Sequence, residues 1–305
     1  MNNKTITIAT RESALAMWQS EYVAGLIEAN TPYQTQLLPM TTEGDQRLEV
    51  TLNKIGGKGL FLKELEQAML AGQADLAVHS MKDVPADLPE AFQICAVFPR
   101  ADESDAFVSN DYQQLSDLPQ GAVVGTSSLR RQSQLLALRP DLTVRPLRGN
   151  VNSRLQKLDD GQYAAIILAS AGLQRLGFED RICSRLQAPE WLPAVSQGAI
   201  GIECLASNDE LAAVLGSLTD HSTWQCVRAE RALNAGLNGS CSVAIGALAN
   251  YQLDDTITLK AAVFSPDGRQ SLSAKQTGYD PEKLGTYVAE DLLSQGARAI
   301  LDLAD

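Results

Sequence analysis

AVVGTSSLRRQSQLLAL, residues 122–138, begins as a short apolar run and continues through a hydroxyl-rich loop into a helical pattern. The apolar run at 122–125 predicts a strand, and residues 128–138 predict a helix that follows it directly. The same order continues downstream, with a strand, a helix and a strand expected at 142–147, 151–158 and 164–168. Strands that alternate with helices predict a mainly parallel sheet with helices on both faces.

The same alternation precedes this stretch and stops near residue 217. Strands are expected at 4–9, 34–40, 75–79 and 105–109, and helices at 13–29 and 60–71. Ser13 suits the N-cap of the first of these helices. Beyond 217 the pattern predicts helices at 221–235 and 281–303, strands at 242–249, 256–264 and 270–276, and a hairpin turn, SPDG, at 265–268. This part of the chain predicts a small α+β domain.

The 305 residues are enough for two domains and a smaller third one. We expect two α/β lobes like those of periplasmic binding proteins, followed by a C-terminal α+β domain. The first lobe would comprise 1–99 and 196–217, the second 100–195, and the C-terminal domain 218–305. A cleft between the two lobes is the expected ligand site, and a hinge between them is expected near residues 99 and 195.

The composition excludes several classes of protein. Apolar residues make up 45% and charged residues 20%, which is typical of a folded globular chain. A net charge of -12 argues against a general nucleic-acid binder and against adhesion to an anionic membrane. The N-terminus has no apolar signal segment and the five cysteines form no CxxC pair, so we expect a cytoplasmic protein with reduced thiols.

Familiar nucleotide and metal motifs are missing. GGKG at 56–59 lies in no P-loop, because that motif needs Gly where Leu52 stands and Ser or Thr where Gly59 stands. Only two histidines are present, His79 and His221, so no metal site is predicted.

Positive charge is concentrated in one segment. Residues 126–175 hold eight basic and three acidic side chains, a balance of +5, so the rest of the chain carries -17. Arginine suits bidentate binding of carboxylates or phosphates. Thr126, Ser127 and Ser128 add hydroxyls and backbone N–H groups at a helix start, where anions bind readily. A solvated helix face is the alternative interpretation of the charge.

Two further positions could carry chemistry. Asp83 lies in HSMKDVP (79–85), directly after a predicted strand, and its carboxylate could hold an N–H donor and stabilise a developing cation. A solvated turn explains this tract equally well. Cys241 lies in a predicted loop, LNGSCSVAIG (237–246), whereas the other four cysteines have apolar neighbours and are expected to be buried structural thiols.

Taken together, these tracts resemble the hydroxymethylbilane synthases, a family also called porphobilinogen deaminases. The resemblance extends over nearly the whole chain. It is carried by IATRESALAMWQ (8–19), GGKGLFLKELE (56–66), DLAVHSMKDVP (75–85), VGTSSLRRQ (124–132), LRGNVNSRL (147–155), AIILASAGLQRLG (165–177) and LPAVSQGAIGIEC (192–204).

The resemblance implies an enzyme that condenses four porphobilinogen molecules into 1-hydroxymethylbilane and releases ammonia. It implies a monomer with a dipyrromethane cofactor, attached to Cys241 by a thioether. Catalytic roles are implied for Asp83, Lys82 and Arg11. Cofactor contacts are implied for Ser13, Lys82, Asp83, Thr126, Ser128, Arg130, Arg131, Arg154 and Gly198. Contacts with porphobilinogen and the growing polypyrrole are implied for Arg11, Arg148, Arg154, Arg175, Gln197, Lys54 and Lys58, the last two in a mobile loop.

One tract departs from the family pattern, and one other function is compatible with the residues. The family usually has Gly-Gly-Cys-x-Val-Pro around the attachment cysteine, where this chain has Ser240 and Ala244 in place of the second Gly and the Pro. The alternative function is a non-catalytic protein that binds a small carboxylate in a two-lobed cleft. Turnover of porphobilinogen distinguishes the two.

Overall fold

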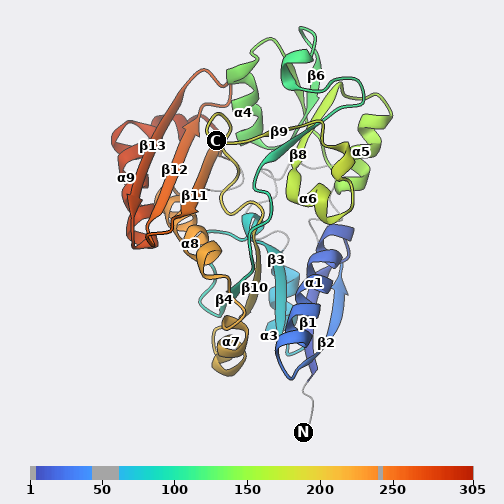
Figure 1. Ribbon diagram of the computed structural model, residues 1–305, viewed down its shortest axis with the longest axis vertical. Coiled ribbons are helices and arrows are strands. Elements are labelled where there is room, and N and C mark those ends of the chain that lie inside the picture. The colour runs from blue at the N-terminus through green and yellow to red at the C-terminus, as the bar shows by residue number, and fades with distance from the viewer. Residues whose placement is uncertain (1–4, 43–61, 240–242, 305) are drawn as a thin grey trace. The chain divides into compact units, whose positions relative to one another are not determined.

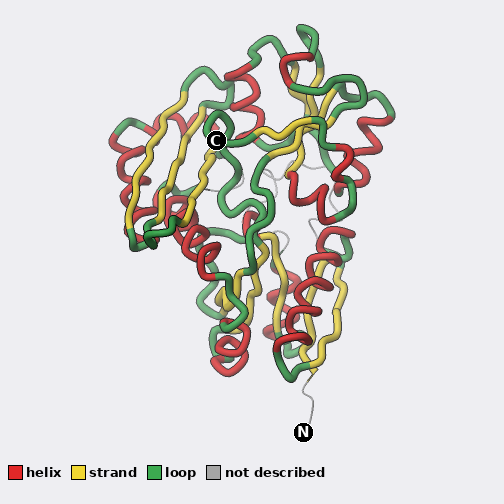
Figure 2. Tube along the Cα trace, viewed as in Figure 1, coloured by secondary structure: helices red, strands yellow, loops and turns green. Residues whose placement is uncertain are grey.

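The computed structural model describes residues 5–42, 62–239 and 243–304 (Figures 1 and 2). The chain forms two compact units. The first comprises Met1–Arg100 and Ala199–Trp224, and the second comprises Ala101–Gly198 and Gln225–Asp305. The second unit therefore contains both the α/β part that follows residue 100 and most of the predicted C-terminal domain. The finer division into three domains stays a prediction.

The first unit is built on a five-stranded sheet with the order β2-β1-β3-β10-β4. β1 is parallel to β2 and β3, whereas β10 runs antiparallel to β3 and β4. Alternate residues of β1, Ile6 and Ile8, are buried with Val23 and Ile27 of α1. The elements are β1 (Thr5–Arg11), α1 (Ala14–Asn30), β2 (Gln34–Met40), α3 (Lys63–Leu70), β3 (Leu76–Ser80), the short helix η2 (Met81–Asp83), β4 (Phe92–Val97), β10 (Ile200–Leu205) and α7 (Asp209–Gly216).

The second unit contains another five-stranded sheet, with the order β7-β6-β8-β5-β9. β6 is parallel to β7 and β8, and β5 is antiparallel to β8 and β9. The elements are β5 (Asp105–Val108), η3 (Leu115–Asp117), β6 (Val123–Gly125), α4 (Leu129–Leu138), β7 (Thr143–Arg145), α5 (Val151–Asp159), β8 (Ala165–Ala169), α6 (Ser170–Arg175), η4 (Glu179–Arg181) and β9 (Ser184–Leu186). The quoted stretch at 122–138 is thus the strand β6 and the helix α4, as predicted.

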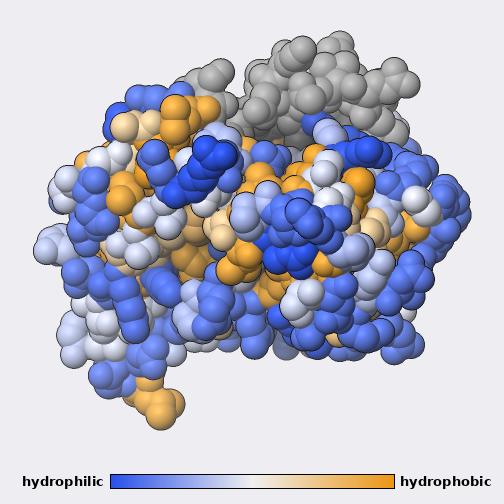
Figure 3. Space-filling model, turned by 90° about the horizontal axis from the view of Figure 1, so that it is seen from above, coloured by the Kyte–Doolittle hydropathy of each residue, from blue (hydrophilic) through white to orange (hydrophobic). Residues whose placement is uncertain are grey.

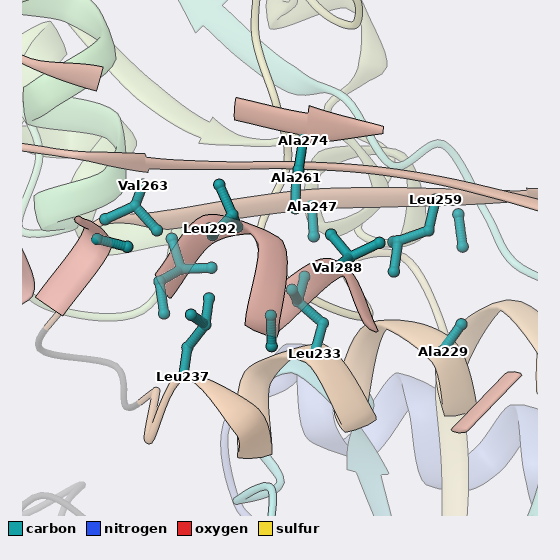
Figure 4. Packing of buried hydrophobic residues seen from close by; sticks show 14 of the residues in the cluster. Ala229, Leu233, Leu237, Ala247, Leu259, Ala261, Val263, Ala274, Val288 and Leu292 are labelled. Carbon is teal, nitrogen blue, oxygen red and sulfur yellow. The ribbon is translucent and has the colours of Figure 1, made fainter. Parts of the chain in front are cut away.

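The C-terminal part is a three-stranded antiparallel sheet, β11-β12-β13, backed by helices. Figure 4 shows Leu233 of α8 and Val288 of α9 directed toward strand residues such as Ala261. Leu259 and Val263 lie two residues to either side of Ala261 and are buried with it, as expected of one face of a strand. The elements are α8 (His221–Gly236), β11 (Ile245–Tyr251), β12 (Ile257–Phe264), β13 (Ser271–Gly278), α9 (Pro281–Ser294), α10 (Ala297–Leu301) and η5 (Asp302–Ala304).

Each five-stranded sheet is mainly parallel, as predicted, with one strand, β10 or β5, that runs antiparallel to both of its neighbours. Two other expectations about the elements are corrected. The single helix expected at 281–303 is interrupted at Gly296, whose φ of 103° is left-handed and ends the helical path. Of the four cysteines expected to be buried, Cys204 and Cys226 are buried, whereas Cys95 and Cys183 are only half-buried.

One face of the protein can be described by the polarity of its surface. The face shown in Figure 3 is largely hydrophilic, with apolar residues scattered over it. Within the described ranges, no helix combines the length and the apolar character that crossing a membrane requires.

Candidate functional site

In the first unit, the predicted site residues follow two neighbouring parallel strands. β1 ends at Arg11 and β3 ends at Ser80, and the two strands pair through Ile8 with Leu76 and Ala9 with Ala77. Because parallel strands end at the same edge of a sheet, Arg11 and Ser13 lie on the edge where Lys82 and Asp83 follow β3. Ser13 is the N-cap of α1, as predicted, and its Oγ accepts a hydrogen bond from the backbone N–H of Ala16 at 3.4 Å.

The turn that carries Asp83 is fixed by its backbone and by its buried first residue. Met81 is 1% exposed and its N–H donates to the carbonyl of Ala199 at 3.0 Å. The N–H of Val84 closes the turn by donating to the carbonyl of Met81 at 3.3 Å. Asp83 itself is exposed. The carboxylate is therefore presented to solvent by a turn whose position does not depend on it.

In the second unit, three loops leave the same sheet edge. β6, β7 and β8 are parallel, so the segments after Gly125, Arg145 and Ala169 start side by side. The first two loops are joined through Ser127, whose Oγ donates to the carbonyl of Leu147 and accepts from its N–H, both at 3.0 Å. α4, α5 and α6 begin at this edge (Figure 1). The TSSLRR and LRGN tracts are thus held together.

The hydroxyls of the first loop order its backbone. Thr126 is 4% exposed, and its Oγ1 accepts from the N–H of Ser128 at 3.2 Å. Ser128 is the N-cap of α4, and its Oγ accepts from the N–H of Arg131 at 3.4 Å. Both hydroxyls thus shape the start of α4. Their predicted contacts with a cofactor stay predictions.

Arg148, Arg154 and Arg175 are half-buried at the same edge. The Nε of Arg154 donates to the carbonyl of Gly149 at 2.7 Å, and an Nη2 hydrogen of Arg175 donates to the carbonyl of Gly198 at 2.6 Å. A guanidinium group has five N–H donors and is suited to two-point binding of a carboxylate or phosphate.

Gln197 and Gly198 lie in a buried turn of the second unit. Gly198 has a φ of 92°, a left-handed conformation that favours glycine. The side-chain amide of Gln197 donates to the carbonyls of Glu103 and Ser104 and to the carboxylate of Asp105, at 2.7, 3.2 and 2.9 Å. The structure therefore uses the Gln197 amide inside the unit.

Arg130 and Arg131 differ from the other arginines because they are almost completely buried. They are 4% and 7% exposed and both bind Asp105, which is fully buried. The Nη1 of Arg130 lies 2.8 Å from Asp105 Oδ2, and the Nε and Nη2 of Arg131 lie 3.0 and 2.7 Å from Asp105 Oδ1. Sequence reasoning missed Asp105. The available signal was an acidic residue that directly precedes an apolar run, residues 106–108, in an arginine-rich part of the chain.

The electrostatics of this cluster are dominated by charge pairing. Burial alone would raise the pKa of Asp105, but the guanidinium groups of Arg130 and Arg131 outweigh burial and hold that pKa well below its usual range. Burial also lowers the pKa of Arg130. The three groups together carry one net positive charge in a buried setting.

This pairing predicts the acid sensitivity of the fold. Because the pKa of Asp105 is depressed from its unfolded-state value of about 3.9, its stabilising contribution is complete above that pH and is lost as the pH falls through the folded-state pKa. The difference in thermal unfolding midpoint between wild type and Asp105→Asn should be constant from about pH 7 to about pH 5 and shrink below about pH 4. Calorimetry across this range measures it, and a difference that already shrinks between pH 7 and pH 5 would contradict the assignment.

Three predicted residues lie outside the described ranges: Lys54, Lys58 and Cys241. Gly239 and Val243, which lie two residues to either side of Cys241, are described. The N–H of Gly239 donates to the carbonyl of Asn234 at 2.8 Å, and the carbonyl of Ala244 accepts from the N–H of Phe264 at 3.0 Å. Gly239 and Ala244 are therefore held by α8 and β12.

The sheet edge of the second unit has the properties of an anion-binding site of an α/β protein. Half-buried guanidinium groups and hydroxyl-rich helix starts gather there, and a buried cluster supplies one further positive charge. A small molecule with several carboxylates or phosphates fits this chemistry.

Comparison with known proteins identifies the family. Residues 6–213 match the model described as "Porphobilinogen deaminase, dipyromethane cofactor binding domain", and residues 224–294 match "Porphobilinogen deaminase, C-terminal domain". The porphobilinogen deaminase of Thiobacillus denitrificans is 56% identical over 301 residues, 98% of each chain. That of Chromobacterium violaceum is 54% identical over 299 residues, 97% of this chain and 96% of that one. The chain belongs to the porphobilinogen deaminase family.

A solved structure resembles the chain more distantly. Lipoprotein Tp32 from Treponema pallidum has a TM-score of 0.46 and 12% identity, covering 71% of this chain and 90% of that chain.

Proposed function

We propose that the chain is a transferase that joins four porphobilinogen molecules head to tail into 1-hydroxymethylbilane, with release of ammonia, in tetrapyrrole biosynthesis. The observation that carries this function is the match of both family models, which together span residues 6–213 and 224–294. The arginine-rich sheet edge supports it independently, because every pyrrole of this substrate and product carries two carboxylates. Such a ligand needs many paired cations when it leaves water.

The second unit fits a dipyrromethane cofactor. A dipyrromethane built from porphobilinogen carries four carboxylates, and Arg130 retains a buried Nε without a hydrogen-bond partner. Thr126, Ser128, Arg130, Arg131 and Arg154 would hold these carboxylates. The predicted contacts of Ser13, Lys82 and the Gly198 backbone with the cofactor belong to the same proposal. When bound, the cofactor supplies a covalent primer on which the chain is built. Its thioether to Cys241 is part of the proposal.

Asp83 is the proposed catalytic carboxylate. Loss of ammonia from porphobilinogen leaves a cation that is delocalised over the pyrrole ring, and a fixed carboxylate beside it lowers the free energy of the transition state. Asp83 is exposed on a turn fixed by Met81 and so is available to the pyrrole N–H groups. Lys82 and Arg11 are proposed to act beside it, as cations that hold substrate carboxylates.

The remaining proposed contacts orient the substrate and the growing polypyrrole. Arg148, Arg154 and Arg175 would bind their carboxylates, and Gln197 would position the turn that Arg175 contacts. Lys54 and Lys58 would add positive charge from the loop that contains them. A reduced, cytoplasmic setting is proposed because Cys241 must be a thiol before attachment, and a monomer is proposed as the working form.

The function is tested by turnover of porphobilinogen. Purified protein should consume about four porphobilinogen molecules and release about four ammonia molecules for each hydroxymethylbilane formed. The hydroxymethylbilane is measured by the absorbance of the porphyrin that it gives on ring closure and oxidation in acid. The ammonia is measured by a separate assay. Saturable binding of porphobilinogen without any release of ammonia would instead indicate the non-catalytic carboxylate-binding protein.

A further inference from the structure

Asp105 occupies the sheet edge that carries the anion-binding arginines. It is the first residue of β5 and pairs with Ala169, the last residue of β8. Because β5 is antiparallel to β8, its beginning lies at the edge where β6, β7 and β8 end. Asp105 is fully buried there. A carboxylate is thus placed beneath the site that we assign to carboxylate ligands.

The protein itself satisfies the accepting capacity of this carboxylate. Oδ1 accepts from Arg131 Nε and Nη2 and from Gln197 Nε2, at 3.0, 2.7 and 2.9 Å. Oδ2 accepts from Arg130 Nη1 at 2.8 Å and from Trp191 Nε1 at 2.7 Å. Five N–H donors therefore meet a group with about four lone-pair positions. Asp105 has no capacity left for a ligand, and any role in binding must act through the residues that it holds.

One of the two arginines that Asp105 holds has a donor without a partner. Two guanidinium groups share one carboxylate, which leaves one positive charge uncompensated within the trio. The Nε of Arg130 is buried and has no hydrogen-bond partner, although Arg130 is only 4% exposed. A buried unpaired donor is costly, and a cluster built only for stability would satisfy it. The excess charge and the free donor both indicate an anion that completes the cluster.

We propose that Asp105 is the positioning residue that aligns Arg130 and Arg131, together with the Gln197 turn, to receive one ligand carboxylate. The proposal rests on the proposed function, since it takes that carboxylate to belong to the dipyrromethane cofactor. The fork of Arg131 on Oδ1 fixes the plane of its guanidinium group, and Arg130 is held between Oδ2 and the carbonyl of Leu192, at 2.8 and 2.7 Å. The rotameric freedom of both side chains is thereby removed before the ligand binds.

The test separates alignment of the arginines from stability of the fold. Asp105→Asn alone leaves two buried guanidinium groups without a counter-charge, so it lowers the unfolding temperature as well as disturbing the two arginines. The informative comparison is therefore Arg130→Gln, which keeps the Arg131–Asp105 fork, against Arg130→Gln combined with Asp105→Asn, which removes the fork but restores the wild-type net charge. The readout is the fraction of purified molecules that carry the cofactor's mass, together with KM and kcat for porphobilinogen.

The double variant should carry the cofactor in about tenfold fewer molecules than Arg130→Gln, or bind porphobilinogen with about tenfold higher KM, when both variants are measured well below their unfolding temperatures. Asp141→Asn is the matched control, because Arg139 makes a comparable two-point contact with Asp141, at 2.8 and 2.7 Å, at the other end of α4. This control should leave loading and KM unchanged. Equal loading and KM in the single and double variants would overturn the role of Asp105. A wild-type protein without turnover would refute the function itself.

Discussion

Asp83→Asn should fold normally and lose nearly all turnover of porphobilinogen. The variant keeps the size of the side chain and one oxygen that can accept a pyrrole N–H, but it removes the negative charge. Removal of one electrostatic contact to a transition state typically lowers kcat by about 100- to 1,000-fold, so a loss of at least about 100-fold is expected. Steady-state kinetics measure it. The fold should persist because the turn is fixed by Met81 and Ala199, and Asp83 is exposed.

Asp87→Asn is the matched control for Asp83. Asp87 is also exposed and follows the same turn, four residues later, so its replacement changes the net charge of the region equally. Turnover should stay near the wild-type rate in this variant. Near-normal turnover in Asp83→Asn, or an equal loss in both variants, would contradict the proposed role of Asp83.

Cys241→Ser should yield a folded protein without cofactor and without turnover. A serine hydroxyl is far less nucleophilic than a thiolate, so no thioether forms and the polypyrrole has no covalent primer. The loss should be complete within the sensitivity of the porphobilinogen assay. The neighbouring core should be unaffected, because Gly239 and Ala244 are held by contacts that do not involve Cys241.

Cys183→Ser provides the comparison for this substitution. The Sγ of Cys183 donates to the carbonyl of Ser109 at 3.2 Å, and a serine hydroxyl can make the same hydrogen bond. We therefore expect full cofactor loading and turnover in Cys183→Ser. Loading that survives in Cys241→Ser would place the attachment at another residue.

The local fold could be predicted from sequence where a segment is strongly patterned. The strand and helix in residues 122–138 were predictable because an apolar run meets a polar loop and a helical pattern in one continuous stretch. β10 was not expected, although Ile200, Ile202 and Cys204 alternate with Gly201 and Glu203 as in a strand. Its antiparallel direction depends on a return of the chain from the second unit, which is a long-range property.

The candidate site shows the same division between local and long-range information. Arg130 and Arg131 stood out by residue type, and the N-cap role of Ser13 followed from the local pattern. Asp105 could not be paired with the arginines from sequence, because 25 residues separate it from Arg130 and the contact depends on the register of β5 against β8. Sequence indicated where the positive charge lies, and the structure shows how that charge is held.

The central claim is that this chain builds hydroxymethylbilane on a dipyrromethane attached to Cys241. The most direct measurement is the intact mass of the purified, active protein. The account predicts a mass greater than that of the sequence by two linked pyrrole units, with the increment located on the peptide that contains Cys241 and absent from Cys241→Ser. Active protein with the unmodified mass of its sequence would contradict the account.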